Sequence, residues 1–164
     1  MRFHVKLEAM DLWRYSVYNM IHSKQGLFNI FIAVVMVALL FLRWGWLSTN
    51  LNYIVLFIMW ILIFAVWQPV IAYIKAKKQI KSAEGQAALD FEFGTQEVKV
   101  SQGGQEIKFP WKKIVKIVVT RTMVIIYMDK IRAYLLPARV IGGDMGEFSR
   151  LVHKHLEEKQ LKGI

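Results

Sequence analysis

The sequence has 164 residues and contains no cysteine. Disulfide bonds, thiolate nucleophiles and zinc sites built on cysteine are therefore excluded. Short catalytic motifs are missing as well: there is no G-x-S-x-G, no phosphate-binding G-x-x-x-x-G-K-[ST], no G-x-G-x-x-G and no H-E-x-x-H. We therefore expect a protein that is not an enzyme and that has no cofactor.

Residues that bind metals are few and scattered. The four histidines are His4, His22, His153 and His155. The last two lie two positions apart in a segment expected to be helical, so they point to different sides and cannot share a metal ion. The acidic residues form no pair suited to acid–base catalysis. We therefore predict neither a catalytic site nor a metal site.

Charge is almost absent from one block of the chain. Between Gly26 and Ile74 the only charged residue is Arg43. From Lys75 onward there are 17 Lys and Arg against 10 Asp and Glu, and residues 1–25 have four against two, which gives a net charge of +10 with Arg43. An uncharged block beside a basic block is typical of membrane proteins. The first residues lack the apolar core of a secretory signal peptide, so none is expected.

Two apolar segments predict membrane-spanning helices. Gly26–Leu47 and Leu51–Ile74 are each long enough, as helices, to cross about 30 Å of hydrocarbon. Trp44 and Trp46 lie where aromatic side chains gather at a membrane interface. The alternative is a pair of buried helices in a soluble core, which we disfavour because too little chain remains to cover them.

The linker between these segments, Ser48–Asn50, is short and predicts an antiparallel helical hairpin. Lysines follow the second segment, whereas only Arg43 borders the linker. By the positive-inside rule we expect both termini in the cytoplasm and the linker outside. Asn29 and Gln68 are polar side chains within the hairpin, and we expect them to pack the helices together rather than to bind a ligand.

The second half of the sequence changes to a period of two. Leu89, Phe91 and Phe93 alternate with acidic residues, which is typical of a half-buried strand. The pair Gly103-Gly104 indicates a two-residue hairpin turn. About six successive strands with short connections, among them the three between Pro110 and Ile141, predict one antiparallel meander.

The last segment is predicted to be a helix. Asp144 is the expected N-cap, with Glu147 three positions later as in a capping box. One face of this helix carries Phe148, Leu151, Val152, His155 and Leu156. The predicted fold class is α+β, with a curved sheet closed by an amphipathic C-terminal helix, which is the outline of a pleckstrin-homology-like (PH-like) fold.

The N-terminus carries a strand pattern of its own. Phe3, Val5 and Leu7 alternate with polar residues, and we expect this strand to pair with the meander, because a lone strand is unstable. Asp11 then caps a helix that leads into the first apolar segment. The predicted divisions are a strand and juxtamembrane helix (1–25), a transmembrane hairpin (26–74), a basic linker (75–86) and a cytoplasmic PH-like domain (87–164).

Basic residues form the candidate binding surface. They comprise a group after the second apolar segment, a group in the sheet region and one arginine: Lys75, Lys77, Lys78 and Lys81; Lys112, Lys113 and Lys116; and Arg139. They are suited to anionic lipid headgroups or an acidic protein partner, and the alternative is a solvated face that only sets membrane topology. Nucleic acid is not expected, because no groove of interleaved basic and aromatic residues is visible. No G-x-x-x-G motif occurs in the apolar segments, so the oligomeric state stays open.

The order of these features resembles a known family, the YcxB-like proteins. The residues that carry the resemblance follow the N-terminal strand and the two apolar segments, and they are Trp111, Ile114, Ile117, Tyr127 and the closing Leu135–Arg139. These are small bacterial membrane proteins with a C-terminal PH-like domain. The resemblance therefore implies a location in the bacterial inner membrane and no established enzymatic activity.

Two functions follow as hypotheses. The first is a membrane-tethered module whose PH-like domain binds a protein or anionic lipid. The second is an immunity protein that neutralises a membrane-active toxin or bacteriocin. The second rests on analogy with other small bacterial membrane proteins that carry PH-like domains.

Overall fold

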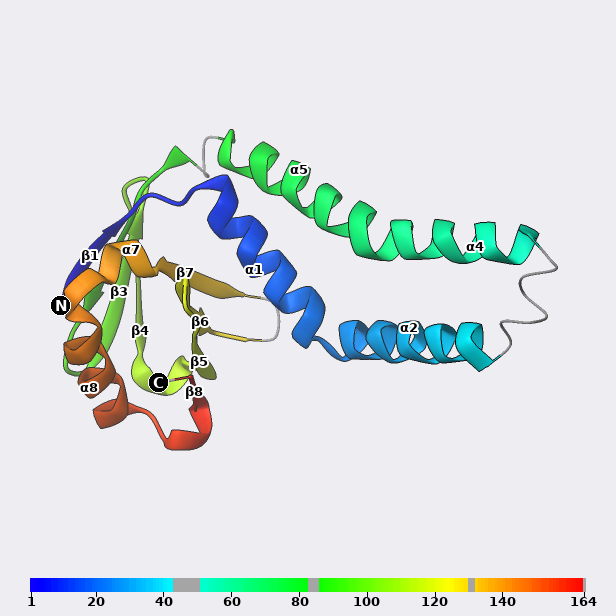
Figure 1. Ribbon diagram of the computed structural model, residues 1–164. Helices are drawn as coiled ribbons and strands as arrows, with labels where there is room; N and C mark the ends of the chain where they lie inside the picture. Colours follow the sequence, from blue (N-terminus) through cyan, green and yellow to red (C-terminus); the bar gives the residue numbers. More distant parts are fainter. Residues whose placement is uncertain (43–50, 83–85, 130–131, 164) are drawn as a thin grey trace. The chain divides into compact units, whose positions relative to one another are not determined.

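The computed structural model describes residues 1–42, 51–82, 86–129 and 132–163 (Figure 1). It divides into two compact units. The sheet unit comprises Met1–Asp11 together with Lys78–Ile164, and the helical unit is Leu12–Lys77. The predicted linker at residues 48–50, and Arg43, Trp44 and Trp46 before it, lie outside the described residues.

The helical unit is built from consecutive helices. They are α1 (Ala9–His22), which begins in the sheet unit, α2 (Lys24–Leu42), α4 (Leu51–Leu62), the π-helical η1 (Ile63–Trp67) and α5 (Gln68–Ile80). Among the described residues, no single helix is long and apolar enough to cross a membrane. One pair, Ala9–His22 and Gly26–Leu39, bent by 65° at its break, has the length and composition to do so. The two predicted spans therefore stay predictions.

The π-helical turn η1 ends at Trp67, two residues before Pro69. Proline has no N–H for the helical ladder, so a helix adjusts locally where one occurs. Here the backbone N–H of Gln68 bonds the carbonyl of Ile63, five residues back. The Pro69 carbonyl also accepts a hydrogen bond from the indole nitrogen of Trp13, at 3.0 Å. This contact ties α5 to α1 within the helical unit.

The first sheet contains the N-terminal strand. Its antiparallel order is β1 (Arg2–Val5), β2 (Leu89–Phe93), β3 (Glu97–Gln102) and β4 (Gln105–Pro110). Phe3 lies opposite Phe91, so the prediction that the N-terminal strand joins the sheet is confirmed. Gly103 and Gly104 have φ of 56° and 85°, as a type I′ turn requires, and the predicted two-residue hairpin is confirmed as well.

The remaining strands form a second sheet, so the prediction of one continuous meander is wrong. Its order is β7 (Ala133–Pro137), β6 (Met123–Tyr127), β5 (Lys116–Val119) and β8 (Leu161–Lys162), with β8 parallel to β5. The break lies at Pro110 and the 3-10 helix η2 (Trp111–Lys113). Pro110 cannot donate to a sheet ladder, and the buried Trp111 turns the chain by bonding the Gly94 carbonyl through its indole nitrogen.

Short helices follow the second sheet. They are α7 (Ala138–Ile141), the 3-10 helices η3 (Gly142–Asp144) and η4 (Glu158–Gln160), and between these α8 (Met145–His155). The predicted inward face of α8 is confirmed, because Phe148 and Val152 are fully buried. Asp144 occupies the N-cap position of α8, but its side chain makes no capping hydrogen bond, so the predicted capping box is absent.

Aromatic rings from distant parts of the chain meet in the core of the sheet unit. Phe3, Phe93 and Phe148 pack edge to face, with ring centroids 5.3–6.3 Å apart. Phe3 is 5% exposed and Val5 is fully buried. Burying such a side chain stabilises a fold by about 1.5–3 kcal/mol. The first strand is therefore an integral part of this core and not an appendage.

Candidate functional site

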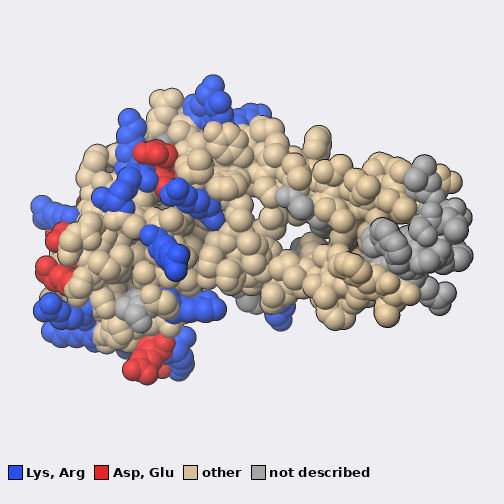
Figure 2. Space-filling model, in the orientation of Figure 1, with Lys and Arg blue, Asp and Glu red and all other residues tan. Residues whose placement is uncertain are grey.

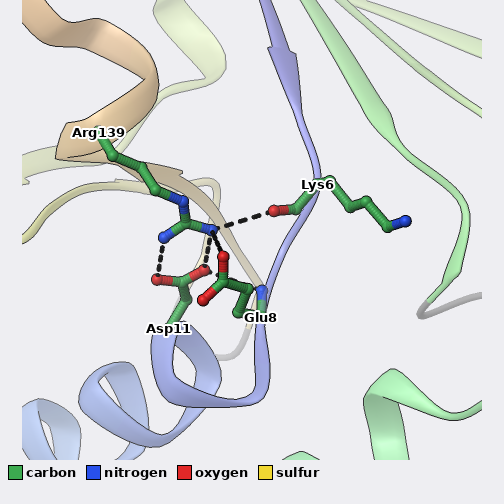
Figure 3. Close-up of polar contacts among 4 residues, drawn as sticks. All are labelled: Lys6, Glu8, Asp11 and Arg139. Carbon is green, nitrogen blue, oxygen red and sulfur yellow. Dashed lines mark hydrogen bonds and ion pairs between the residues drawn. The ribbon is translucent and has the colours of Figure 1, made fainter.

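A buried carboxylate and an arginine join the two ends of the sheet unit (Figure 3). Asp11, in the first turn of α1, is 1% exposed. The two terminal nitrogens of Arg139, on α7, donate to its two oxygens, each at 2.7 Å. A bidentate pair of this kind is stronger than a single hydrogen bond and fixes the direction of both side chains.

The same arginine makes two further contacts with the N-terminal segment (Figure 3). It donates to the backbone carbonyl of Lys6 at 3.1 Å and lies 3.3 Å from a carboxylate oxygen of Glu8. The hydrogen bonds that Arg139 donates to Asp11 raise the pKa of its guanidinium above the ordinary value, so the guanidinium is always charged. Most of its donors are therefore used inside the sheet unit. Its predicted role in binding a membrane or a partner stays a prediction.

Asp11 holds the start of α1 as well as Arg139. The sequence predicted it as an N-cap, but α1 begins at Ala9, which makes Glu8 the cap residue. The side chain of Asp11 instead reaches back and accepts the backbone N–H of Glu8 at 2.9 Å. This is one half of a capping box. One buried carboxylate thus satisfies a helix terminus and a guanidinium together.

The predicted lysines are exposed apart from the half-buried Lys116, and they form two groups along the chain. Lys75, Lys77 and Lys78 are exposed along the end of α5, and Lys81 is exposed just beyond it. Lys112 and Lys113 are exposed on η2 and Lys116, half-buried, opens β5, so the structure brings these three together. On the face that Figure 2 shows, Lys and Arg are scattered and interrupted by acidic residues rather than gathered into one patch.

The outer face of the first sheet carries charges of both signs. Arg2 bonds Glu92 at 3.0 Å, which lowers the pKa of that carboxyl, and His4 lies 2.6 Å from Asp90. These pairs line an open depression of about 460 Å³ over β1, β2 and β3. Lys99 and Glu106 also line it, so side chains of both signs are interspersed over the depression.

The remaining polar residues of interest have structural contacts. The ring of His155 stacks on Trp111, with centroids 4.7 Å apart, and lies 2.7 Å from the Thr95 carbonyl. Asn29 and Gln68 are half-buried on α2 and α5, and their predicted role in helix packing stays a prediction. Within the described ranges, no group of three or more His, Cys, Asp or Glu could hold a metal ion.

The pair of Asp11 and Arg139 is the connection that sequence reasoning missed. Each residue was noticed separately, one as a helix cap and the other as a surface cation. The available signal was the predicted pairing of the N-terminal strand with the sheet, which brings residues 128 positions apart into one unit. Asp11 follows that strand in the first turn of α1, where Arg139 from the other end of the domain reaches it.

We predict that Arg139→Met lowers the free energy of unfolding by about 2 kcal/mol, since it leaves Asp11 buried without its cation. The effect of breaking a fully buried pair is about 3–5 kcal/mol, and it is smaller here because the arginine side chain is 42% exposed. Denaturant unfolding of the full chain in detergent, followed by tryptophan fluorescence, measures the change.

Two further variants give this measurement its controls. Arg132→Met, which breaks an exposed pair with Asp129, should lower the free energy by less than about 1 kcal/mol. Asp11→Leu combined with Arg139→Met should regain part of the loss, because no unpaired charge remains. Equal losses in Arg132→Met and Arg139→Met would contradict the central role of the buried pair.

Comparison with known proteins gives a family match within the sheet unit. No curated protein and no solved structure matches the chain. The sequence model of the YcxB-like protein family matches residues 93–152, which run from the last residue of β2 into α8. Over this segment, the resemblance to the YcxB-like family that the sequence predicted is therefore confirmed.

Proposed function

We propose that this chain is a non-enzymatic protein of the bacterial inner membrane that presents an interaction domain at the membrane surface. The helical unit is the membrane anchor, and the sheet unit is a PH-like domain that binds anionic lipid headgroups or a protein. The observation that carries this proposal is the exposure of apolar side chains along the uncharged helices.

Apolar exposure on these helices is far beyond that of an ordinary protein surface. On α2, Phe31 is 63% exposed, Phe41 75% and Leu42 80%, and on α4 large side chains such as Leu56 are similarly exposed. Scattered apolar residues are normal on a surface, but a continuous apolar surface marks an interaction site. α4 and residues 25–42 of α2 contain no charged residue, so hydrocarbon is the environment that suits them.

The PH-like assignment rests on the arrangement of the sheet unit. Four antiparallel strands form one sheet, three consecutive antiparallel strands form the core of the other, and α8 closes the unit with its buried Phe148. Antiparallel strands followed by a closing C-terminal helix are the features that support a PH-like assignment. Folds of this kind host many functions, so the binding role rests on the surface rather than on the fold.

Lysines supply the surface for anionic lipid. Lys75, Lys77, Lys78 and Lys81 follow the apolar run directly and are all exposed. A basic segment beside a membrane anchor gains about 1 kcal/mol per lysine from an anionic leaflet. A second group of lysines lies within the sheet unit and comprises Lys112, Lys113 and Lys116. In this proposal they bind anionic headgroups at the membrane surface.

We expect the full chain to remain in the membrane pellet after alkaline carbonate treatment and to be released only by detergent. The physical reason is that the apolar surface of α2 and α4 is more stable in hydrocarbon than in water. Fractionation of expressing bacterial cells followed by immunoblotting makes the measurement. Recovery of folded chain in the carbonate supernatant would contradict the membrane anchor.

We also expect the triple variant Lys112→Glu, Lys113→Glu and Lys116→Glu to move the sheet unit away from anionic bilayers. Because the chain has no cysteine, Val115→Cys in the same segment accepts a single fluorophore. Energy transfer from it to headgroup-labelled lipid should rise with anionic lipid content at low salt, and it should fall in the triple variant. Added salt should weaken the effect, since screening shortens the Debye length.

A matched control changes the charge equally elsewhere. Arg150→Glu, Lys154→Glu and Lys162→Glu replace three exposed cations of the same unit and should leave most of the energy transfer intact. If anionic lipid does not raise the transfer in the parent chain, these lysines do not bind headgroups, and the proposal is reduced to a protein partner.

A further inference from the structure

The outer edge of β4 is the part of the sheet unit that the proposed function leaves unused. β4 is the last strand of the first sheet, and Gln105 to Lys108 are all exposed along it. In an antiparallel sheet, the N–H and C=O of alternate residues point to opposite neighbours. An edge strand therefore offers every second residue to a further strand.

The hydrogen bonds of the sheet determine which residues those are. Met1 and Phe93 exchange both backbone hydrogen bonds, at 3.1 and 2.8 Å. Hydrogen-bonded and non-hydrogen-bonded pairs alternate along each strand, so this pair fixes the pattern across the registers of β2 and β3. In that pattern, the backbone N–H and C=O of Ile107 and Phe109 point toward β3. The two-residue turn at Gly103-Gly104 requires the same assignment, because it places a hydrogen-bonded pair directly beside it. The backbone groups of Glu106 and Lys108 consequently point outward.

The sequence at this edge is complementary to itself. Suppose that a second copy of β4 lies antiparallel to the first, across a two-fold axis at Ile107. Glu106 then faces the second copy's Lys108, and Lys108 faces the second copy's Glu106. This is also the register in which the outward backbone groups of these two residues bond each other, giving four hydrogen bonds. Opposite charges directly across a strand pair are favourable. One register thus pairs the outward backbone groups and also places opposite charges across the two strands.

Two neighbouring residues fit the same arrangement. Ile107 lies on the same side of β4 as the buried Phe109, yet it is 53% exposed because the core does not reach this edge. Across the two-fold axis it would meet its own copy, and each would cover the other. Pro110 has no N–H to donate, so the new ladder ends where that residue begins.

We propose that the β4 edge is a self-association surface, through which two copies of this chain join their first sheets into one continuous antiparallel sheet. Charged residues on an edge strand normally protect it from pairing. Within one chain, Lys108 and Glu106 pair with each other, with Nζ 3.1 Å from Oε1. These charges still oppose unrelated strands, whereas a second copy in this register adds an opposite charge across each of them. The interface is small compared with the roughly 1,200 Å² of stable complexes, so the pairing is weak and depends on concentration.

Cysteine crosslinking of the full chain tests this proposal without background, because the parent has no cysteine. In the proposed register the Cα atoms of Ile107 and its copy form a non-hydrogen-bonded pair about 4.5 Å apart, a distance at which a disulfide forms. Mild oxidation of Ile107→Cys in detergent should therefore give a dimer band. Val115→Cys, which is as exposed but lies off the strand, should give at least several-fold less. Equal yields from the two variants would overturn the proposal.

Charge exchange tests the register itself. In the Ile107→Cys background, Lys108→Glu places like charges across the pair and should reduce the dimer yield several-fold. Adding Glu106→Lys restores opposite charges and should return the yield to that of the Ile107→Cys parent. If the double exchange crosslinks no better than Lys108→Glu alone, the proposed two-fold register is wrong. Circular dichroism of each variant establishes that its secondary structure is intact.

Discussion

The pairing of β1 with β2 is the constraint on which the sheet unit depends. The first strand and its partner are separated in sequence by the whole helical unit, so the sheet unit cannot complete its core from contiguous chain. Phe3 and Val5 supply buried side chains that no later strand replaces. The helical unit is thus an insertion into a domain that must close around both of its ends.

The buried pair of Asp11 and Arg139 fixes the point at which the chain leaves that domain. α1 begins in the sheet unit and continues into the helical unit. Its first turn is held by Asp11, which is in turn held by an arginine from α7. Because a bidentate pair sets direction as well as distance, the start of α1 is positioned by the sheet unit.

Period-two alternation was sufficient to predict the strands, including the detached one at the N-terminus, and the glycine pair was sufficient to predict the hairpin turn. The division into two sheets was missed because local alternation does not distinguish a strand that continues a sheet from one that starts another. The first sheet ends at Pro110, and the buried Trp111 turns the chain there before the second sheet begins. The short parallel strand β8 was missed because two residues carry no periodicity.

The candidate site was less predictable than the fold. Exposed lysines could be found from sequence alone, since their role needs only charge and position relative to the apolar segments. Arg139 could not be told apart from them, because its partner lies 128 residues away and is recognised only once the ends of the domain have met. The complementary edge at Glu106 and Lys108 likewise needed the register of four strands, which fixes the backbone groups that point outward.

Hydrogen–deuterium exchange of the full chain tests most directly whether the two ends form one domain. The amides of β1 that face β2 should be protected to the same degree as those of β2 and β3, because they open only when the shared core opens. Denaturant at sub-unfolding concentrations should then reduce the protection of all three strands together. Exchange of the Phe3 and Val5 amides within seconds, while β2 and β3 stay protected, would show that the N-terminal strand is not part of the core and would contradict the account.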